Sequence, residues 1–193
     1  HKMANEIVEI PIVIGGKEIK TGNTNTCVMP HDHHHILANY HMAGNEEVDI
    51  AINNSLETWK SWSKTPLEKR TEIFRKAAEL LQGKWRDRIN AATMLNQSKN
   101  VFQAEVDSAC ELIDFFNFNA EYAEKIYYNQ PLISPEGVHN YLEYRPLEGF
   151  IFAITPFNFT SIAGNLPTAP ALMGNVAIWK PASSAILPCY FLM

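Results

Sequence analysis

The amino-acid sequence predicts an α/β fold in which an N-terminal β-hairpin and a layer of helices precede the first βαβ unit of a parallel sheet. Two β-rich runs surround Gly15-Gly16, and a glycine pair in that setting is a strong hairpin signal. Apolar residues then recur at every third or fourth position between residues 45 and 128, which indicates helices. Residues 150–181 have the pattern of a strand, a tight turn, a helix of small residues and a second strand.

This pattern divides the chain into four segments. An N-terminal hairpin at residues 7–20 and a loop rich in Thr, Asn and His fill residues 1–44, and a helical layer fills residues 45–130. Residues 131–149 carry one strand, and residues 150–193 begin the parallel sheet. Parallel strands are normally flanked by further strands and covered on both faces, so we expect the sheet to be incomplete at Met193.

The helical layer begins with three helices. The first starts at Asn45 and carries one apolar stripe, which comprises Val48, Ile52, Leu56 and Trp59. The second starts at residues 65–68, TPLE, which match a capping box with proline at the first helical position. Its predicted core face comprises Ile73, Phe74, Ala77, Leu80 and Leu81. Gly83 ends this helix, and the helical pattern resumes at Trp85.

A longer helix is predicted from Phe102 to Tyr128, and prolines at positions 131 and 135 prevent its continuation. Residues 138–145, VHNYLEYR, alternate in polarity as a strand does. Residues 146–149 then turn the chain into the βαβ unit.

Composition argues against several classes of function. The net charge is −5, whereas nucleic-acid binding requires a basic patch. No apolar run approaches the roughly 18 residues that a membrane span needs. The three cysteines are odd in number and lack CxxC spacing, which favours a reducing compartment over disulfides or zinc. Residues 31–35, HDHHH, lack the third and fourth ligands of a metal site, so we expect no metal.

The turn at residues 155–159, TPFNF, lies at the carboxyl end of a predicted strand, where open α/β sheets bind their ligands. Asn158 there offers an amide N–H that suits an oxygen on which negative charge develops in acyl or aldehyde chemistry. The alternative is that Asn158 only caps the following helix, because asparagine is a favoured cap.

Lys180 ends the second strand of the unit, level with this turn. A lysine at that place suits ribose hydroxyls or a phosphate, and the alternative is an ordinary surface lysine. The G-x-G-x-x-G dinucleotide fingerprint is absent.

An acidic stretch lies in the long helix. Between Asn100 and Glu124 the sequence has no Lys or Arg and six acids, which are Glu105, Asp107, Glu111, Asp114, Glu121 and Glu124. A solvated acidic face is one interpretation, and a site for a cationic ligand is the other.

Three motifs extend this interpretation. ITPFNFT, the helix GNLPTAPALMGN and WKP together resemble the aldehyde dehydrogenase superfamily. With CELIDFFNFN at residues 110–119, the likeness is greatest to the branch that oxidises L-glutamate γ-semialdehyde, formed from Δ1-pyrroline-5-carboxylate, in proline catabolism. The resemblance covers nearly the whole chain from about residue 10. It implies the N-terminal part of such an enzyme, with an incomplete Rossmann-type NAD-binding sheet.

The resemblance implies roles for individual residues. Asn158 corresponds to the oxyanion-hole asparagine and Glu111 to a glutamate that receives the ammonium group of the substrate. Phe159 corresponds to an aromatic residue that packs on the aliphatic part of the substrate. The implied cofactor-binding residues are Thr155, Pro156, Phe157 and Lys180.

The resemblance also implies NAD as cofactor, a small aldehyde substrate and a homo-oligomer, located in the cytoplasm of a bacterium or in the mitochondrial matrix of a eukaryote. None of the cysteines has the glycine-rich context of the catalytic nucleophile, so we expect this chain alone to be inactive. Two alternatives are an aldehyde dehydrogenase of other specificity and a non-catalytic oligomerisation or binding module.

Overall fold

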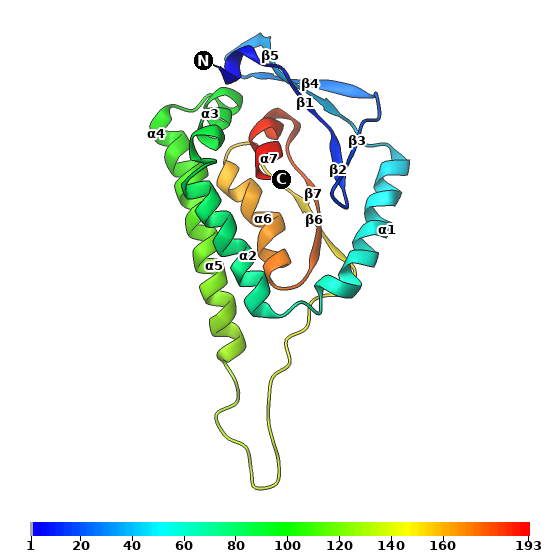
Figure 1. Ribbon diagram of the computed structural model, residues 1–193, viewed down its shortest axis with the longest axis vertical. Coiled ribbons are helices and arrows are strands. Elements are labelled where there is room, and N and C mark those ends of the chain that lie inside the picture. Colours follow the sequence, from blue (N-terminus) through cyan, green and yellow to red (C-terminus); the bar gives the residue numbers. More distant parts are fainter. Residues whose placement is uncertain (1) are drawn as a thin grey trace.

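The structure, a computed structural model, describes residues 2–193 (Figure 1). The N-terminal part contains a 3-10 turn and five strands, namely η1 (Met3–Asn5), β1 (Val8–Ile10), β2 (Ile12–Ile14), β3 (Lys17–Ile19), β4 (Thr24–Met29) and β5 (Asp32–His41). The helical layer contains α1 (Asn45–Trp62), α2 (Leu67–Gln82), α3 (Arg86–Gln97), α4 (Val101–Ala104), the π-helical η2 (Glu105–Cys110) and α5 (Glu111–Tyr128). The C-terminal part contains β6 (Phe150–Ile154), α6 (Thr160–Leu172), β7 (Val176–Lys180), η3 (Ser183–Ala185) and α7 (Ile186–Leu192). This arrangement confirms the predicted α/β class.

The predicted N-terminal hairpin is formed by β2 and β3. The two strands are antiparallel, with Ile14 opposite Lys17. Gly15 and Gly16 form the turn with φ angles of 57° and 74°, in the left-handed region that glycine adopts without strain. β1 does not belong to this hairpin, because it pairs in parallel with β5.

The loop predicted over residues 21–44 is wrong. β4 and β5 pair antiparallel there and, with β1, form a three-stranded sheet in the order β1-β5-β4. The carboxyl-terminal half of β5 is buried, including Leu37, Ala38 and Tyr40. β5 begins with an exposed run of histidines and ends with the buried apolar residues. Because the polar run comes first, the composition of the segment suggests a polar loop.

The helices form where they are predicted, but their buried faces differ. Val48 and Leu56 of α1 remain exposed. In α2, Ile73 and Leu80 are also exposed, and Ala78 is buried instead. The α2 face that packs on the core runs at helical spacing through Leu67, Arg70, Thr71, Phe74, Ala78 and Leu81.

The capping box predicted at residues 65–68 does not form. Pro66, rather than Thr65, is the N-cap residue of α2, and no side chain caps the helix. The hydroxyl of Thr65 donates instead to the carbonyl of Ser61, at 3.4 Å. Gly83 ends α2 as predicted.

The long helix predicted at residues 102–128 is present as α4, η2 and α5 in succession. Asn100 and Gln103 form a capping box at its start. The π turn of residues 105–110 lies directly before Glu111. Such turns insert an extra residue into a helix and are frequent at functional sites.

The strand predicted at residues 138–145 does not form. Residues 129–149 instead make a long extended loop that leaves the body of the molecule after α5 and returns to β6 (Figure 1). A strand needs a neighbouring strand to bond its backbone groups, and no ladder among residues 2–193 includes this segment.

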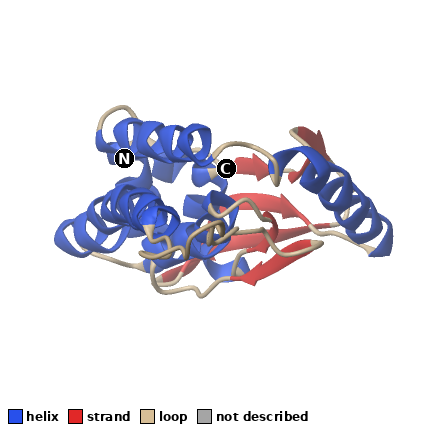
Figure 2. Ribbon diagram, turned by 90° about the horizontal axis from the view of Figure 1, so that it is seen from below, coloured by secondary structure: helices blue, strands red, loops and turns tan. Residues whose placement is uncertain are grey.

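The βαβ unit forms as predicted. β6 and β7 are parallel, with a register that runs from Phe150 opposite Val176 to Ile154 opposite Lys180. α6 connects them (Figure 1). Figure 2 shows that the strands of the molecule lie between helices on either side. Phe152 of β6 is 57% exposed, although parallel sheets are usually covered on both faces.

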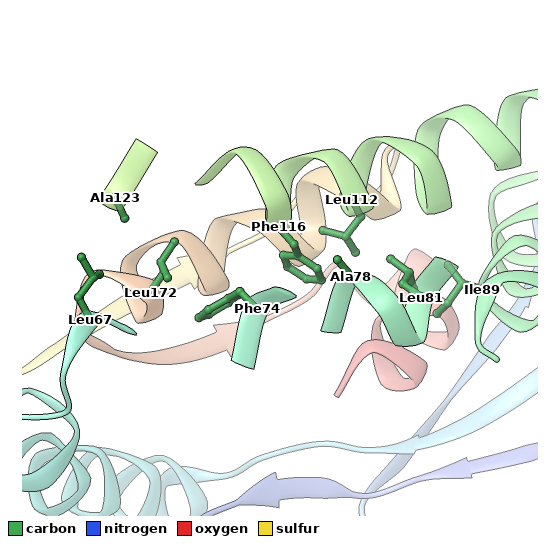
Figure 3. Close-up of a cluster of buried hydrophobic side chains, with 9 residues drawn as sticks. All are labelled: Leu67, Phe74, Ala78, Leu81, Ile89, Leu112, Phe116, Ala123 and Leu172. Atoms are coloured by element: carbon green, nitrogen blue, oxygen red, sulfur yellow. The ribbon is translucent and has the colours of Figure 1, made fainter. Parts of the chain in front are cut away.

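One hydrophobic cluster joins α2, α3, α5 and α6 (Figure 3). Phe74 and Phe116 meet edge to face with their ring centres 5.8 Å apart. Leu112 of α5 is fully buried there. Leu112 also lies close to Gly164 of α6, so the start of α5 packs against the first half of α6, near the predicted site residues.

Candidate active site

The site residues lie at the carboxyl end of β6 and β7. The register places Ile154 beside Lys180, and the Thr155 N–H donates to the Lys180 carbonyl at 3.2 Å. The turn that carries Asn158 therefore begins level with Lys180. This edge is where open α/β sheets bind ligands.

Thr155 anchors the base of this turn. Its side chain is only 3% exposed, and its hydroxyl oxygen accepts a hydrogen bond from the Trp179 indole N–H at 2.9 Å. The hydroxyl group thus ties β6 to β7 directly. Pro156 is half-buried and Phe157 is exposed, so the chain rises from the buried anchor to the surface within two residues.

Asn158 is exposed and does not cap α6. The N-cap residue is Phe159, whose carbonyl accepts the first helical hydrogen bond, from the N–H of Ala163 at 3.0 Å. Within residues 2–193 the side chain of Asn158 has no hydrogen-bond partner, so its amide remains available to a ligand.

Lys180 is exposed at the end of β7. None of the ion pairs formed within the described chain includes its ammonium group. An uncompensated cation at this edge suits a polar or anionic ligand group.

Four of the six acids in the acidic stretch are paired with bases. The pairs are Glu105 with Arg86, Asp107 with Lys99, Glu121 with Lys125, and Glu124 with Arg75. The guanidinium of Arg86 holds the pKa of Glu105 below its usual value, and Arg75 does the same for Glu124. The two acids without an ion pair in the described chain are the exposed Asp114 and the half-buried Glu111.

Glu111 is held by Ser161, the second residue of α6. The Ser161 hydroxyl donates to Oε2 of Glu111, and Ser161 itself is fully buried. The N-terminal end of a helix also stabilises a negative charge. A partly buried carboxylate with a fixed position and no cation is a suitable receptor for an ammonium group.

Phe159 is fixed by Lys99. The Lys99 ammonium lies 4.3 Å from the centre of the Phe159 ring and 2.6 Å from Oδ2 of Asp107. The side chains of Lys99 and Asp107 are 13% and 22% exposed. This mostly buried ion pair therefore holds the Phe159 ring through a cation–π contact.

Sequence reasoning did not identify Ser161, Lys99 or the π turn. Lys99 precedes the helix that carries Asp107, so helical spacing does not reveal their pairing in the sequence. No local pattern indicates the contact between Ser161 and Glu111, because the two residues are fifty positions apart.

None of the three cysteines is activated as a nucleophile. Burial raises the pKa of Cys27 and raises that of Cys189 to about 12. Burial, followed by the neighbouring Glu105 carboxylate, raises the pKa of Cys110. Because the thiolate is the reactive form, these sites disfavour nucleophilic attack.

Residues 2–193 contain no group of three His, Cys, Asp or Glu side chains that could hold a metal ion. No helix in the same range is long and apolar enough to cross a membrane.

Comparisons with known proteins show which family this chain belongs to. A family model described as "Aldehyde dehydrogenase family" matches residues 18–193. The chain is 50% identical over 186 residues to a Dictyostelium discoideum protein named delta-1-pyrroline-5-carboxylate dehydrogenase, mitochondrial, and the match covers 96% of this chain and 33% of that protein. It is 46% identical over 181 residues to the Homo sapiens protein of the same name, covering 94% of this chain and 32% of that protein.

Solved structures show the same relationship. The crystal structure of the delta-pyrroline-5-carboxylate dehydrogenase from Mycobacterium tuberculosis has a TM-score of 0.96 and 47% identity, and the match covers 100% of this chain and 36% of that one. A 1-pyrroline-5-carboxylate dehydrogenase from Thermus, with bound NAD, has a TM-score of 0.90 and 26% identity over 96% of this chain and 36% of that one. The chain spans about a third of the length of the relatives it matches. By the family match over residues 18–193 and these relatives, the chain belongs to the aldehyde dehydrogenase family.

Proposed function

We propose that this chain supplies one side of the active site of an NAD-dependent dehydrogenase that converts L-glutamate γ-semialdehyde to L-glutamate in proline catabolism. The observation that carries this proposal is the carboxylate of Glu111, which is half-buried and lacks a cation within the described chain. It is bonded by Ser161 of α6, three residues beyond Asn158. The names of the relatives support it, because several are called delta-1-pyrroline-5-carboxylate dehydrogenase.

The proposed substrate has an aldehyde at one end and an amino-acid group at the other. Glu111 would bind the ammonium group, and the ring of Phe159 would pack on the methylene groups between the two ends. Asn158 would then lie at the aldehyde end. Glu111 begins α5, and Asn158 and Phe159 directly precede α6, whose second residue, Ser161, bonds Glu111; this proximity supports the proposed arrangement.

The overall reaction consumes the aldehyde, one NAD and one water, and it yields the carboxylate, NADH and protons. This chain would contribute to catalysis by electrostatic stabilisation, because the Asn158 side-chain N–H would stabilise the aldehyde oxygen as it gains negative charge. The thiol nucleophile has no counterpart among the three buried or half-buried cysteines of this chain. We therefore expect the 193-residue chain alone to form no NADH from pyrroline-5-carboxylate.

NAD would accept the hydride, and the residues at the sheet edge fit such a cofactor. Lys180 is exposed and unpaired within the described chain, at the edge where nucleotides bind parallel sheets. We assign Lys180 to the adenosine ribose, and Thr155, Pro156 and Phe157 to the wall of the nicotinamide path. NAD-bound relatives from Mycobacterium tuberculosis and Thermus support this choice of cofactor.

A substrate panel on the full-length protein tests the proposal. Wild type and Glu111→Gln are compared on glutamate γ-semialdehyde and on 5-oxopentanoate, which lacks the amino group. We expect Glu111→Gln to raise KM for the amino aldehyde at least tenfold more than for the analogue, since a charged hydrogen bond is worth about 1.5–3 kcal/mol. Equal changes for both substrates would instead favour an aldehyde dehydrogenase of other specificity.

We further propose that residues 129–149 dock on a second copy of the chain. The segment projects from the body and exposes several apolar side chains, among them Leu132, Ile133, Tyr141 and Leu147. Large apolar side chains on a projecting segment are typical of interaction surfaces. Replacement of residues 132–144 by a Gly-Ser linker should dissociate the full-length protein in sedimentation experiments, and an unchanged assembly would contradict this role.

Several relatives from eukaryotes, among them the Dictyostelium discoideum and Homo sapiens proteins, are named mitochondrial. We propose the mitochondrial matrix for this protein if its source is a eukaryote, and the cytoplasm if it is a bacterium. Fluorescence microscopy of a tagged full-length protein tests this assignment.

A further inference from the structure

Ser161 has an unusual place for a serine. It lies in the first turn of α6 and is fully buried, where its hydroxyl needs a partner. A serine inside a helix often bonds the carbonyl four residues earlier, but that position is Phe157, outside the helix. The hydroxyl of Ser161 donates instead to Oε2 of Glu111, on a different helix.

Close packing next to the Ser161–Glu111 hydrogen bond fixes the distance between α5 and α6. Gly164 lies one turn after Ser161, and Leu112 directly follows Glu111. A Cβ atom added to Gly164 would lie 2.9 Å from Cδ2 of Leu112 and 3.2 Å from Cδ1 of Leu192, so the glycine permits a close approach. Leu112 is fully buried. The packing therefore brings Ser161 and Glu111 together and leaves little freedom in their separation.

The contact engages only one oxygen of the carboxylate. Oε2 accepts from Ser161, whereas Oε1 has no hydrogen-bond partner elsewhere in residues 2–193. The neighbouring carboxylate one turn earlier, Asp107, is already neutralised by Lys99 at 2.6 Å. Of the two acids without an ion pair in the described chain, Asp114 is exposed, whereas Glu111 is half-buried and held by a second helix. Glu111 is thus the better placed of the two to receive a cation in a fixed position.

We propose that Ser161 is a positioning residue, which fixes the Glu111 carboxylate through Oε2 so that Oε1 receives the ammonium group of the substrate. This inference rests on the proposed function. It adds that substrate selectivity depends on a buried hydroxyl that does not itself touch the substrate. Without that hydroxyl, the Glu111 side chain would occupy several rotamers, and only some would reach the ammonium group.

Steady-state kinetics on the full-length protein test the role of Ser161. The variants are Ser161→Ala, which removes the hydroxyl, and Ser161→Cys, which keeps nearly the same volume but is a weak donor. Each is measured with glutamate γ-semialdehyde and with 5-oxopentanoate. We expect both variants to raise the KM ratio of the two substrates about fivefold to tenfold, because a hydrogen bond to a charged group is lost. The kcat ratio should change less than twofold.

The two variants separate positioning from packing. If Ser161→Cys keeps the wild-type KM ratio while Ser161→Ala does not, the side chain only fills space and the inference is wrong. Parallel changes for both substrates would also overturn it. Glu111→Gln is measured beside them: if it leaves the KM ratio unchanged, the proposed ammonium site itself fails. If Glu111→Gln raises the KM ratio but neither Ser161→Ala nor Ser161→Cys does, only the positioning role of Ser161 is rejected.

Discussion

The ammonium of Lys99 lies 4.3 Å from the centre of the Phe159 ring and simultaneously 2.6 Å from the carboxylate of Asp107. One mostly buried cation therefore neutralises an acid of the π turn and supports the aromatic residue next to Asn158. The relationship connects the start of the long helix to the turn above β6, and stability measurements can detect it.

Replacement of Lys99 by methionine should lower the unfolding free energy of the full-length protein by about 1–2 kcal/mol, because Asp107 is left partly buried without its cation. Urea unfolding measures the loss. Lys60→Met is the matched control, since Lys60 pairs with Glu57 at 2.5 Å but both side chains are exposed. The control should change stability by less than about 0.5 kcal/mol. Equal losses in the two variants would contradict a special role for Lys99.

Asn158→Ala should lower kcat of the full-length protein by roughly 10²–10³, as the loss of one oxyanion donor does. The dissociation constant of NAD should change little, and so should the melting temperature, because the side chain is exposed and unbonded within the described chain. Stopped-flow and steady-state measurements of NADH formation provide kcat. An unchanged kcat would remove Asn158 from the mechanism.

Thiol alkylation should distinguish the three cysteines. A raised pKa lowers the thiolate fraction at a given pH, so with a pKa of about 12 Cys189 should be mostly thiol at pH 8. Relative to a free thiol of pKa about 8.5, its thiolate population falls roughly 10³-fold. Iodoacetamide at pH 8, followed by peptide mass spectrometry, should label the half-buried Cys110 before Cys27 and Cys189. Rapid labelling of Cys189 in the folded protein would disprove this order.

Gly164→Ala should destabilise the protein by about 1–3 kcal/mol, because the new methyl group overpacks the contact between α5 and α6. The cost should fall when Leu112→Ala opens space opposite the methyl group. A double-mutant cycle of Gly164→Ala and Leu112→Ala measures this coupling. Additive effects would show that the two residues do not restrain each other.

Local signals in the sequence account for much of the fold. The Gly15-Gly16 turn, the helices and the βαβ unit follow from backbone preference and apolar period, and each forms close to its predicted bounds. Strands that depend on distant partners behave differently. β5 forms because β1 and β4 flank it, whereas residues 138–145 have the pattern of a strand and find no partner within the described chain. An alternating sequence shows that a segment can form a strand, and the presence of a neighbouring strand in the folded chain decides whether it does.

The candidate site divides in the same way. Asn158 and Lys180 are recognisable because chain order places them at strand ends. Glu111 is one of six acids in the stretch between Asn100 and Glu124, and only the structure shows that four of the others are paired. Ser161 has no sequence signal at all, since its role depends on how closely two helices pack.

The π turn of residues 105–110 sets the angular phase of the helix that follows it. Each residue of an α-helix advances the side-chain direction by about 100°, so a single added residue changes which face meets a neighbour. With the π turn between them, α4 begins at its Asn100 cap and Glu111 of α5 faces α6. A one-residue deletion within residues 105–110 should preserve helix content yet rotate the carboxylate away from Ser161. Substrate selectivity in this family member would then depend on helix winding as much as on the identity of the acid.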